Sequence, residues 1–251
     1  MIFLDGGFGT VIQTLGLRPG EDPVDWNIEH PDLIRKVHSS YVEAGSNVVL
    51  TNTFGVNRIK YRGRYSIEKL VSCALDNASA LGAKVALDMG PSGKLLKPAG
   101  DLEFDEAVDA YSEVVKSAMR SKNRPDAIFI ETFSDLHEIK AAIIAAKENS
   151  DLPVYATLSF SDDLKLLTGA DIDAASALLE ALGVEAYGLN CGMGPLGMKP
   201  LVERLAEIST RPVIVKPNAG LPKSVDGKTV YDVLPEEFAE DVADMLRSGA
   251  R

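Results

Sequence analysis

The sequence contains few of the residues that most often mark a function. It has two cysteines, three histidines and one tryptophan in 251 residues. Two cysteines in a chain of this length do not make a disulfide framework, so we expect Cys73 and Cys191 to be thiols. Basic residues are outnumbered as well, with 26 Lys and Arg against 37 Asp and Glu and a net charge of -11. This balance argues against nucleic acid or an anionic membrane as a partner.

Long apolar runs are absent too. None approaches the roughly 18 residues that a membrane span requires. The N-terminal sequence MIFLDGGFGT lacks the basic start and the small-residue cleavage site of a signal peptide. We therefore expect a cytoplasmic protein whose ligand is a small molecule or another protein.

What the sequence does contain is a repeated pattern of strand and helix. Apolar runs of about five to seven residues occur at 2–5, 47–53, 84–90, 126–132, 154–160, 186–191 and 212–218. Stretches of helical period lie near 31–45, 66–82, 104–121, 135–149, 171–182, 198–209 and 235–248. Repeated units of this kind predict an α/β fold, and their number and spacing favour a (β/α)8 TIM-type barrel. An open, doubly wound sheet is the alternative.

No linker or change of composition divides the chain, so we expect one barrel domain over residues 1–251. A closed barrel needs an eighth strand, and the sequence ends at Arg251, where that strand would begin. We therefore expect either that the eighth strand is missing from this sequence or that the barrel is closed in some other way. Because unpaired sheet edges invite pairing with another chain, we also expect a homo-oligomer.

Polar residues gather where the predicted strands end. In a TIM-type barrel the carboxyl ends of the strands carry the active site. The candidates at these ends are Asp5, Gly6, Gly7, Asn52, Thr53, Glu131, Thr132, Asn190 and Cys191. Two carboxylates, several amides and hydroxyls and one thiol predict a site for a polar ligand.

Several of these residues allow more than one interpretation. Asp5 could bind a ligand amine or serve as a turn residue. Glu131 ends the apolar run IFIE and needs a partner, which could be a ligand ammonium or a Lys or Arg side chain. Cys191 could be a nucleophile, a metal ligand or a core thiol. Lys216 could form a Schiff base, although a packed lysine stem is the more common arrangement.

Two glycine patterns resemble nucleotide-binding motifs but are incomplete. Residues 192–197 read G-x-G-x-x-G, yet no acid ends the following strand to hold a ribose hydroxyl. Residues 90–95 read GPSGKL, which lacks the spacing of a phosphate loop and its Ser or Thr after the lysine. Neither pattern predicts nucleotide binding.

Seven segments together resemble the homocysteine S-methyltransferase family, most closely the homocysteine-binding domain of cobalamin-dependent methionine synthase. They are DGGFGT at 5–10, DWN at 25–27 with Pro31, YVEAGSNVVLTNTFG at 41–55, GPSGKLLKP at 90–98, IETFSD at 130–135, GLNCGMGP at 188–195 and KPNAGLP at 216–222. They occur in family order over nearly the whole chain.

The resemblance implies methyl transfer to the thiol of homocysteine, giving methionine. A free thiol has a pKa of about 8.5 and is mostly protonated at pH 7, whereas the thiolate is the nucleophile. Zinc in this family holds the substrate sulfur as a thiolate, and Cys191 matches the first zinc ligand. Asp5 and Glu131 match the acids that hold the substrate amino group. The surrounding pocket matches Asn52, Thr53, Phe54 and Asn190.

The resemblance also implies a methylcobalamin donor carried by a corrinoid domain or protein. The family takes two more zinc ligands from a Gly-Gly-Cys-Cys segment in the eighth strand, which this sequence does not contain. Two alternatives therefore accompany the main hypothesis. One is a non-catalytic module that binds an amino acid or a corrinoid partner, and the other is a methyltransferase that uses S-methylmethionine or a betaine.

Overall fold

The computed structural model describes residues 1–220, 223–225, 228–231 and 233–250. Contacts between residues divide the chain into two compact units. Unit 1 comprises residues 1–130 and 141–154, and unit 2 comprises residues 131–140 and those from 155 onward. The expected single domain over residues 1–251 stays a prediction.

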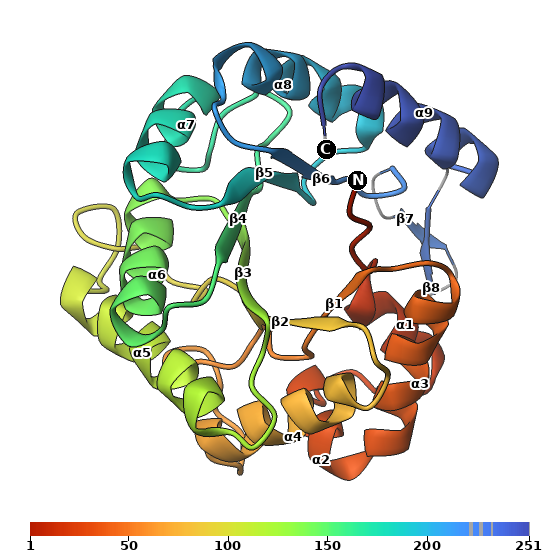
Figure 1. Cartoon of the computed structure of the whole chain (residues 1–251), viewed down its shortest axis with the longest axis vertical. Coiled ribbons are helices and arrows are strands. Elements are labelled where there is room, and N and C mark those ends of the chain that lie inside the picture. Colours follow the sequence, from red (N-terminus) through yellow and green to blue (C-terminus); the bar gives the residue numbers. More distant parts are fainter. Residues whose placement is uncertain (221–222, 226–227, 232, 251) are drawn as a thin grey trace. The chain divides into compact units, whose positions relative to one another are not determined.

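Six parallel strands form the main sheet, in the order of the sequence (Figure 1). They are β1 (Val48–Leu50), β2 (Lys84–Met89), β3 (Ala127–Phe133), β4 (Val154–Leu158), β5 (Ala186–Asn190) and β6 (Val213–Lys216). In unit 1, Val49 pairs with Val85 and Leu87 with Ile128. In unit 2, Thr157 pairs with Gly188 and Leu189 with Val215. The six predicted strands between residues 47 and 218 are therefore present.

Helices alternate with these strands. They are α1 (Phe8–Thr14), η1 (Pro23–Asp25), α2 (Trp26–Glu29), α3 (Pro31–Glu43), α4 (Ile67–Ser79), α5 (Phe104–Arg120), α6 (Leu136–Asn149), α7 (Ile172–Ala181), α8 (Pro195–Ile208) and α9 (Pro235–Arg247). Ser66 caps α4 by accepting from the Lys69 amide, and Asp171 caps α7 in the same way through Ala174. Pro31 and Pro235 occupy first turns, as the sequence predicted.

The structure differs from the sequence prediction near the chain's beginning. The predicted strand at 2–5 is reduced to one bridge, between Leu4 and Val48. The short helices α1, η1 and α2 were not predicted. Each has at most seven residues, and so short a segment shows too few helical turns for its periodicity to be recognised.

The region after β6 also contains unpredicted structure. An antiparallel hairpin, β7 (Lys223–Val225) with β8 (Lys228–Val230), precedes α9. After α9, Ala250 forms a parallel bridge with Val213 of β6. The chain thus returns to the edge of the sheet within unit 2. Across the described segments, no helix is long and apolar enough to span a membrane.

A buried histidine belongs to the packing of unit 1. His38 of α3 is 0% exposed, and its ring centroid lies 4.9 Å from that of Phe8 in α1. Neither ring nitrogen has a hydrogen-bond partner among the described residues. Burial lowers the pKa of His38 from 6.5 to about 4, because the charged ring would lose its hydration.

This shift predicts a loss of stability in mild acid. Between pH 6.5 and 4 the unfolded chain binds a proton at His38 that the folded chain does not, so the free energy of unfolding falls as the pH falls. This stability is present above pH 6.5, and roughly 2 kcal/mol of it is lost at pH 5. Urea unfolding at pH 7, 6 and 5 measures it.

We expect the His38→Leu variant to lose about 2 kcal/mol less than the wild type between pH 7 and 5. The matched control is His137→Leu, because His137 is exposed on α6 and its replacement should leave the wild-type pH dependence unchanged. Identical pH dependence of the wild type and His38→Leu would contradict the prediction.

Candidate functional site

Three of the predicted site residues meet in unit 2, where β3 and β5 end. Asn190 Oδ1 accepts a hydrogen bond from the Thr132 amide at 2.9 Å. Its Nδ2 donates to Thr132 Oγ1 at 2.6 Å and lies 3.6 Å from Cys191 Sγ. Thr132 Oγ1 is 3.9 Å from the same sulfur. The Asn190 side chain, which is 1% exposed, thus links the two strand ends and contacts the thiol.

The backbone at this point is unusual. Thr132 has φ 67° and Cys191 has φ 53°, in the left-handed region that residues other than glycine rarely adopt. A residue held there costs about 1–3 kcal/mol, and such residues concentrate at functional sites. Gly192 follows with φ 67°, and an added Cβ would lie 2.4 Å from the Phe160 carbonyl oxygen. This turn directs Cys191 away from the line of β5.

Glu131 is paired with a lysine in the same unit. Its Oε2 lies 2.8 Å from Lys216 Nζ, and each side chain is 15% exposed. Glu131 precedes Thr132 in β3, and the Lys216 carbonyl accepts a hydrogen bond from the Cys191 amide at 3.1 Å. Of the partners considered for Glu131, the structure shows the lysine. Lys216 was predicted only as a packed stem or a Schiff base, and its ion pair was missed.

The zinc implied by the resemblance can be tested against these side chains. Structural and catalytic zinc sites use three or four protein ligands. Among the residues that the structure describes, no group of three or more His, Cys, Asp and Glu side chains is arranged to hold a metal. Cys191 offers one soft ligand, and Thr132 and Asn190, which contact it, are not usual zinc ligands. The described residues therefore do not form a zinc site by themselves.

The remaining predicted residues lie in unit 1. Asp5 is 5% exposed, and its Oδ2 accepts a hydrogen bond from the Leu50 amide at 2.8 Å. This bond fixes the aspartate against β1. Tyr41 contacts the next two residues. Its hydroxyl donates to the Gly7 carbonyl at 2.8 Å, and its ring lies so close to Gly6 that an added Cβ there would be 3.0 Å from it. Gly6 thus permits a close approach of backbone to side chain.

Asn52, Thr53 and Phe54 follow β1 in a tightly bonded segment. Asn52 Nδ2 donates to the Pro23 carbonyl at 2.8 Å, and the buried Thr53 hydroxyl donates to the Asp88 carbonyl at 2.6 Å. The Phe54 carbonyl accepts from the Gly90 amide. The first bond joins this segment to η1, and the other two join it to the end of β2. Thr53 Oγ1 is therefore engaged by the protein itself.

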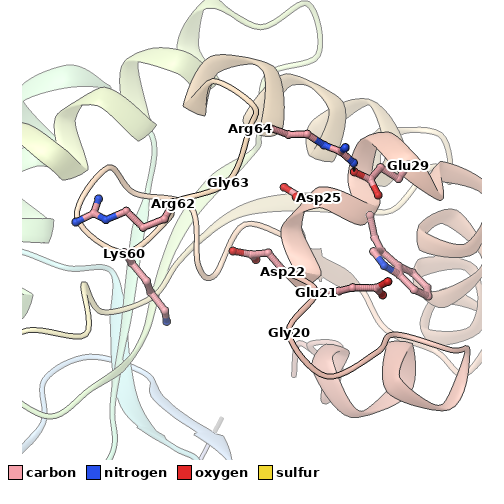
Figure 2. Close-up of a pocket in the computed structure, with 10 residues that line it drawn as sticks. Gly20, Glu21, Asp22, Asp25, Glu29, Lys60, Arg62, Gly63 and Arg64 are labelled. Atoms are coloured by element: carbon pink, nitrogen blue, oxygen red, sulfur yellow. Dashed lines mark hydrogen bonds and ion pairs between the residues drawn. The ribbon is translucent and has the colours of Figure 1, made fainter.

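A cavity of about 510 Å³ lies next to this segment in unit 1. Figure 2 shows that its side chains come from two stretches of chain. It is lined by Gly20, Glu21, Asp22, Asp25, Trp26, Glu29, Lys60, Arg62, Gly63 and Arg64. Lys60 Nζ lies 4.8 Å from the centroid of the Phe54 ring, so a predicted site residue contacts the cavity wall. The DWN segment supplied a sequence signal for Asp25 and Trp26.

Charge pairs organise the walls of the cavity. Arg64 forms an ion pair with Glu29, and this contact lowers the pKa of the glutamate. The Tyr61 hydroxyl donates to Asp25 Oδ1 at 2.6 Å. Burial, followed by this bond, raises the pKa of Tyr61 to about 12. Burial also raises the pKa of Asp22. The cavity is thus polar, with both signs of charge.

The structure therefore brings together Glu131, Thr132, Asn190 and Cys191 in unit 2. Asp5, Gly6, Gly7, Asn52, Thr53 and Phe54 all belong to unit 1. Joint action of Asp5 and Glu131 on one ligand stays a prediction, as do the roles of these residues.

Comparison with known proteins gives consistent results. The family model described as homocysteine S-methyltransferase matches residues 2–251. Methionine synthase of Mycobacterium tuberculosis is 31% identical over 96% of the chain, and that of Mycobacterium leprae is 32% identical over 88%. The alignments cover 22% and 19% of those two proteins. The chain thus spans about a fifth of the length of these relatives.

A solved structure shows the same fold. The metallated form of the homocysteine methyltransferase MmuM from Escherichia coli has a TM-score of 0.82 and 20% sequence identity. The match covers 100% of this chain and 89% of MmuM. The apo form of MmuM gives a TM-score of 0.75. These likenesses confirm the predicted α/β fold of the TIM-barrel class.

The contacts of Asn190 predict its contribution to stability. In Asn190→Ala the Thr132 amide loses its acceptor while it stays partly buried, and an unsatisfied group of this kind costs about 1–3 kcal/mol. We expect the free energy of unfolding to fall by about 2 kcal/mol in urea denaturation.

The matched control is Asn123→Ala, which removes a surface hydrogen bond to Asp76 and should cost less than about 0.5 kcal/mol. Equal effects of the two substitutions would show that the bonds from Asn190 to Thr132 do not stabilise the strand ends.

Proposed function

Because the chain belongs to the homocysteine S-methyltransferase family, we propose that it transfers a methyl group to the thiol of homocysteine and so forms methionine. One observation carries the proposal within the structure. Thr132 and Asn190 contact Cys191, which has a left-handed backbone, and Glu131 precedes Thr132 in β3. A sulfur and a carboxylate near the ends of β5 and β3, within one unit, suit a ligand that has a thiol and an amine.

In the proposed reaction, the homocysteine sulfur loses its proton to the solvent and attacks the methyl carbon of the donor. The new bond joins sulfur to that carbon, and the bond between the methyl group and the donor breaks with its electrons left on the donor. Glu131 binds and orients the substrate ammonium, with Asp5 as the second acid. The peptide amides at Gly6 and Gly7 are open to a ligand's approach because neither residue carries a side chain.

Zinc forms a separate part of the proposal. Crystals of the metallated form of MmuM support metal use by a protein of the same fold, and Cys191 would be one ligand. Zinc content per chain, measured by mass spectrometry of the metal in the wild type and in Cys191→Ser, tests this part. Any zinc that the wild type binds through Cys191 should be lost in the variant, and an equal zinc content above zero in both would exclude Cys191 as a ligand.

The methyl donor and the partners are proposals as well. The likeness to the methionine synthases supports methylcobalamin carried by a corrinoid domain or protein. S-methylmethionine and a betaine are the alternative donors. Formation of a homo-oligomer stays a prediction, for which light scattering gives the measurement.

A methyl-transfer assay tests the main proposal. The chain is incubated with homocysteine, zinc and each donor in turn, and methionine is measured by mass spectrometry. We expect product with at least one donor and a loss of 100-fold or more in Cys191→Ser, on the order of a lost transition-state contact. Glu131→Gln should raise KM for homocysteine by about tenfold, because one charged contact is lost.

The matched control is Cys73→Ser, since Cys73 lies within α4 in unit 1 and should not affect turnover. No methionine from any donor would contradict the proposal.

A binding module without catalysis is the second candidate. The lack of a group of metal-binding side chains among the described residues favours it. Calorimetry with homocysteine, with and without zinc, distinguishes the two candidates. Binding that does not depend on the metal, together with no turnover, would favour the module.

A further inference from the structure

Unit 1 contains a second cavity, between two of its helices. Its volume is about 330 Å³, which lies within the range of small-molecule sites. The lining comes from residues 66–72 at the beginning of α4 and from residues 117–122 at the end of α5. These two helices pack against each other within unit 1. None of the lining residues belongs to the segments that resemble the methyltransferase family, so the proposed function does not account for this cavity.

The spacing of the lining residues explains why the cavity is polar. On α4 they include Ser66, Lys69 and Ser72, and on α5 they include Ser117 and Arg120. Residues three apart lie on the same side of a helix. Each helix therefore contributes a polar face to the lining.

Basic side chains dominate the charge of this lining. Lys69, Arg120 and Lys122 are exposed and stand against one acid, Glu68. Across the part of the chain that the structure describes, none of these three basic side chains forms an ion pair or a hydrogen bond. The cavity thus holds three cations whose charge no neighbouring carboxylate neutralises.

This lack of pairing contrasts with other basic residues of the same unit. Lys84 lies 2.6 Å from a carboxylate oxygen of Asp126, and Lys94 lies 3.1 Å from one of Asp101. Acids are also plentiful, since the net charge of the chain is -11. Positive charge concentrated in a concave surface attracts anions. The unpaired cations therefore indicate a site for an anion.

Hydroxyl groups add neutral donors to the charged ones. Ser66 Oγ accepts a hydrogen bond from the Lys69 amide at 3.2 Å, so its own proton stays available. The half-buried Ser72 hydroxyl makes no hydrogen bond to the residues that the structure describes. Because each hydroxyl supplies one donor, two neutral donors line the cavity together with the three cations.

We propose that this cavity binds a small phosphate-bearing anion of about the size of pyrophosphate. Arg120 pairs with two phosphate oxygens, which is the geometry that guanidinium groups favour. Lys69 and Lys122 neutralise the remaining charge as mobile point charges, and the Ser66 and Ser72 hydroxyls donate to further oxygens. This site does not depend on the proposed methyl transfer.

A small anion fits the cavity better than a large one does. Nucleic acid and anionic membranes bind to broad basic surfaces, whereas this chain is acidic and its unpaired cations surround a small cavity. An acidic peptide is the competing ligand, and it enters the test as a separate probe.

Calorimetry with inorganic pyrophosphate tests the proposal. We expect the wild type to bind it and Arg120→Gln to weaken the binding by about tenfold or more, because a charge-assisted contact with two oxygens is lost. Ser72→Ala should weaken it by about threefold, since a neutral hydrogen bond contributes less than a charged one.

Two matched controls remove a positive charge close to the cavity. Arg124 is exposed and does not line the cavity, so Arg124→Gln should change the affinity by less than about twofold. If Arg120→Gln does not fold, Lys122→Met gives a second measurement. Its control is Lys116→Met, because Lys116 is an exposed residue of α5 outside the lining.

Three results would overturn the proposal. One is a wild type that does not bind pyrophosphate. Another is equal weakening by Arg120→Gln and Arg124→Gln, or by Lys122→Met and Lys116→Met, which would show attraction by the overall charge and no specific site. The third is tighter binding of an oligoglutamate peptide than of pyrophosphate, which would identify the surface as a docking site for an acidic peptide.

Discussion

The site of unit 2 depends on the hydrogen bonds between Asn190 and Thr132. Thr132 near the end of β3 has φ 67° and Cys191 after β5 has φ 53°, and the Cys191 amide donates to the Lys216 carbonyl of β6. The Asn190 side chain bonds both the amide and the hydroxyl of Thr132, as acceptor and as donor. Without it, the turn at Cys191 would have fewer bonds to offset its strain.

The same turn explains why the residue after Cys191 is glycine. A Cβ at Gly192 would lie 2.4 Å from the Phe160 carbonyl oxygen, closer than nonbonded atoms approach. Gly188 within β5 is equally constrained, because its added Cβ would lie 1.9 Å from the Ile214 carbonyl oxygen. The glycines of this segment therefore allow close packing of backbones, and a phosphate loop is not needed to explain them.

Much of this arrangement could be predicted from the sequence, because buried parallel strands have a recognisable composition. Buried on both faces, β2 and β5 are apolar nearly throughout, and the residues that end such strands share one edge of a sheet. That reasoning placed Thr132, Asn190 and Cys191 together. It could not give the pairing of Glu131 with Lys216, since a lysine's partner depends on the path of a flexible stem between strands that are not neighbours.

The beginning of the chain shows a different limit. The run IFLD has strand composition, yet it contributes one bridge, at Leu4, because strand formation depends on pairing as well as on side chains. Helix α1 was missed since seven residues give too little periodicity, and its packing against α3 supplies the stabilisation that its length does not. The cavity of unit 1 forms where residues 20–29 approach residues 60–64, and no local sequence pattern predicts an approach of two distant segments.

The two carboxylates predicted to bind an amino group, Asp5 and Glu131, have different kinds of hydrogen-bond partner. Asp5 accepts a hydrogen bond from a backbone amide of β1. Because this donor is fixed in the backbone, the bond positions the carboxylate. Glu131 is bonded to a side chain, which can move. A ligand ammonium can therefore displace the partner of Glu131 at the cost of one ion pair, whereas at Asp5 it must add to the existing bond.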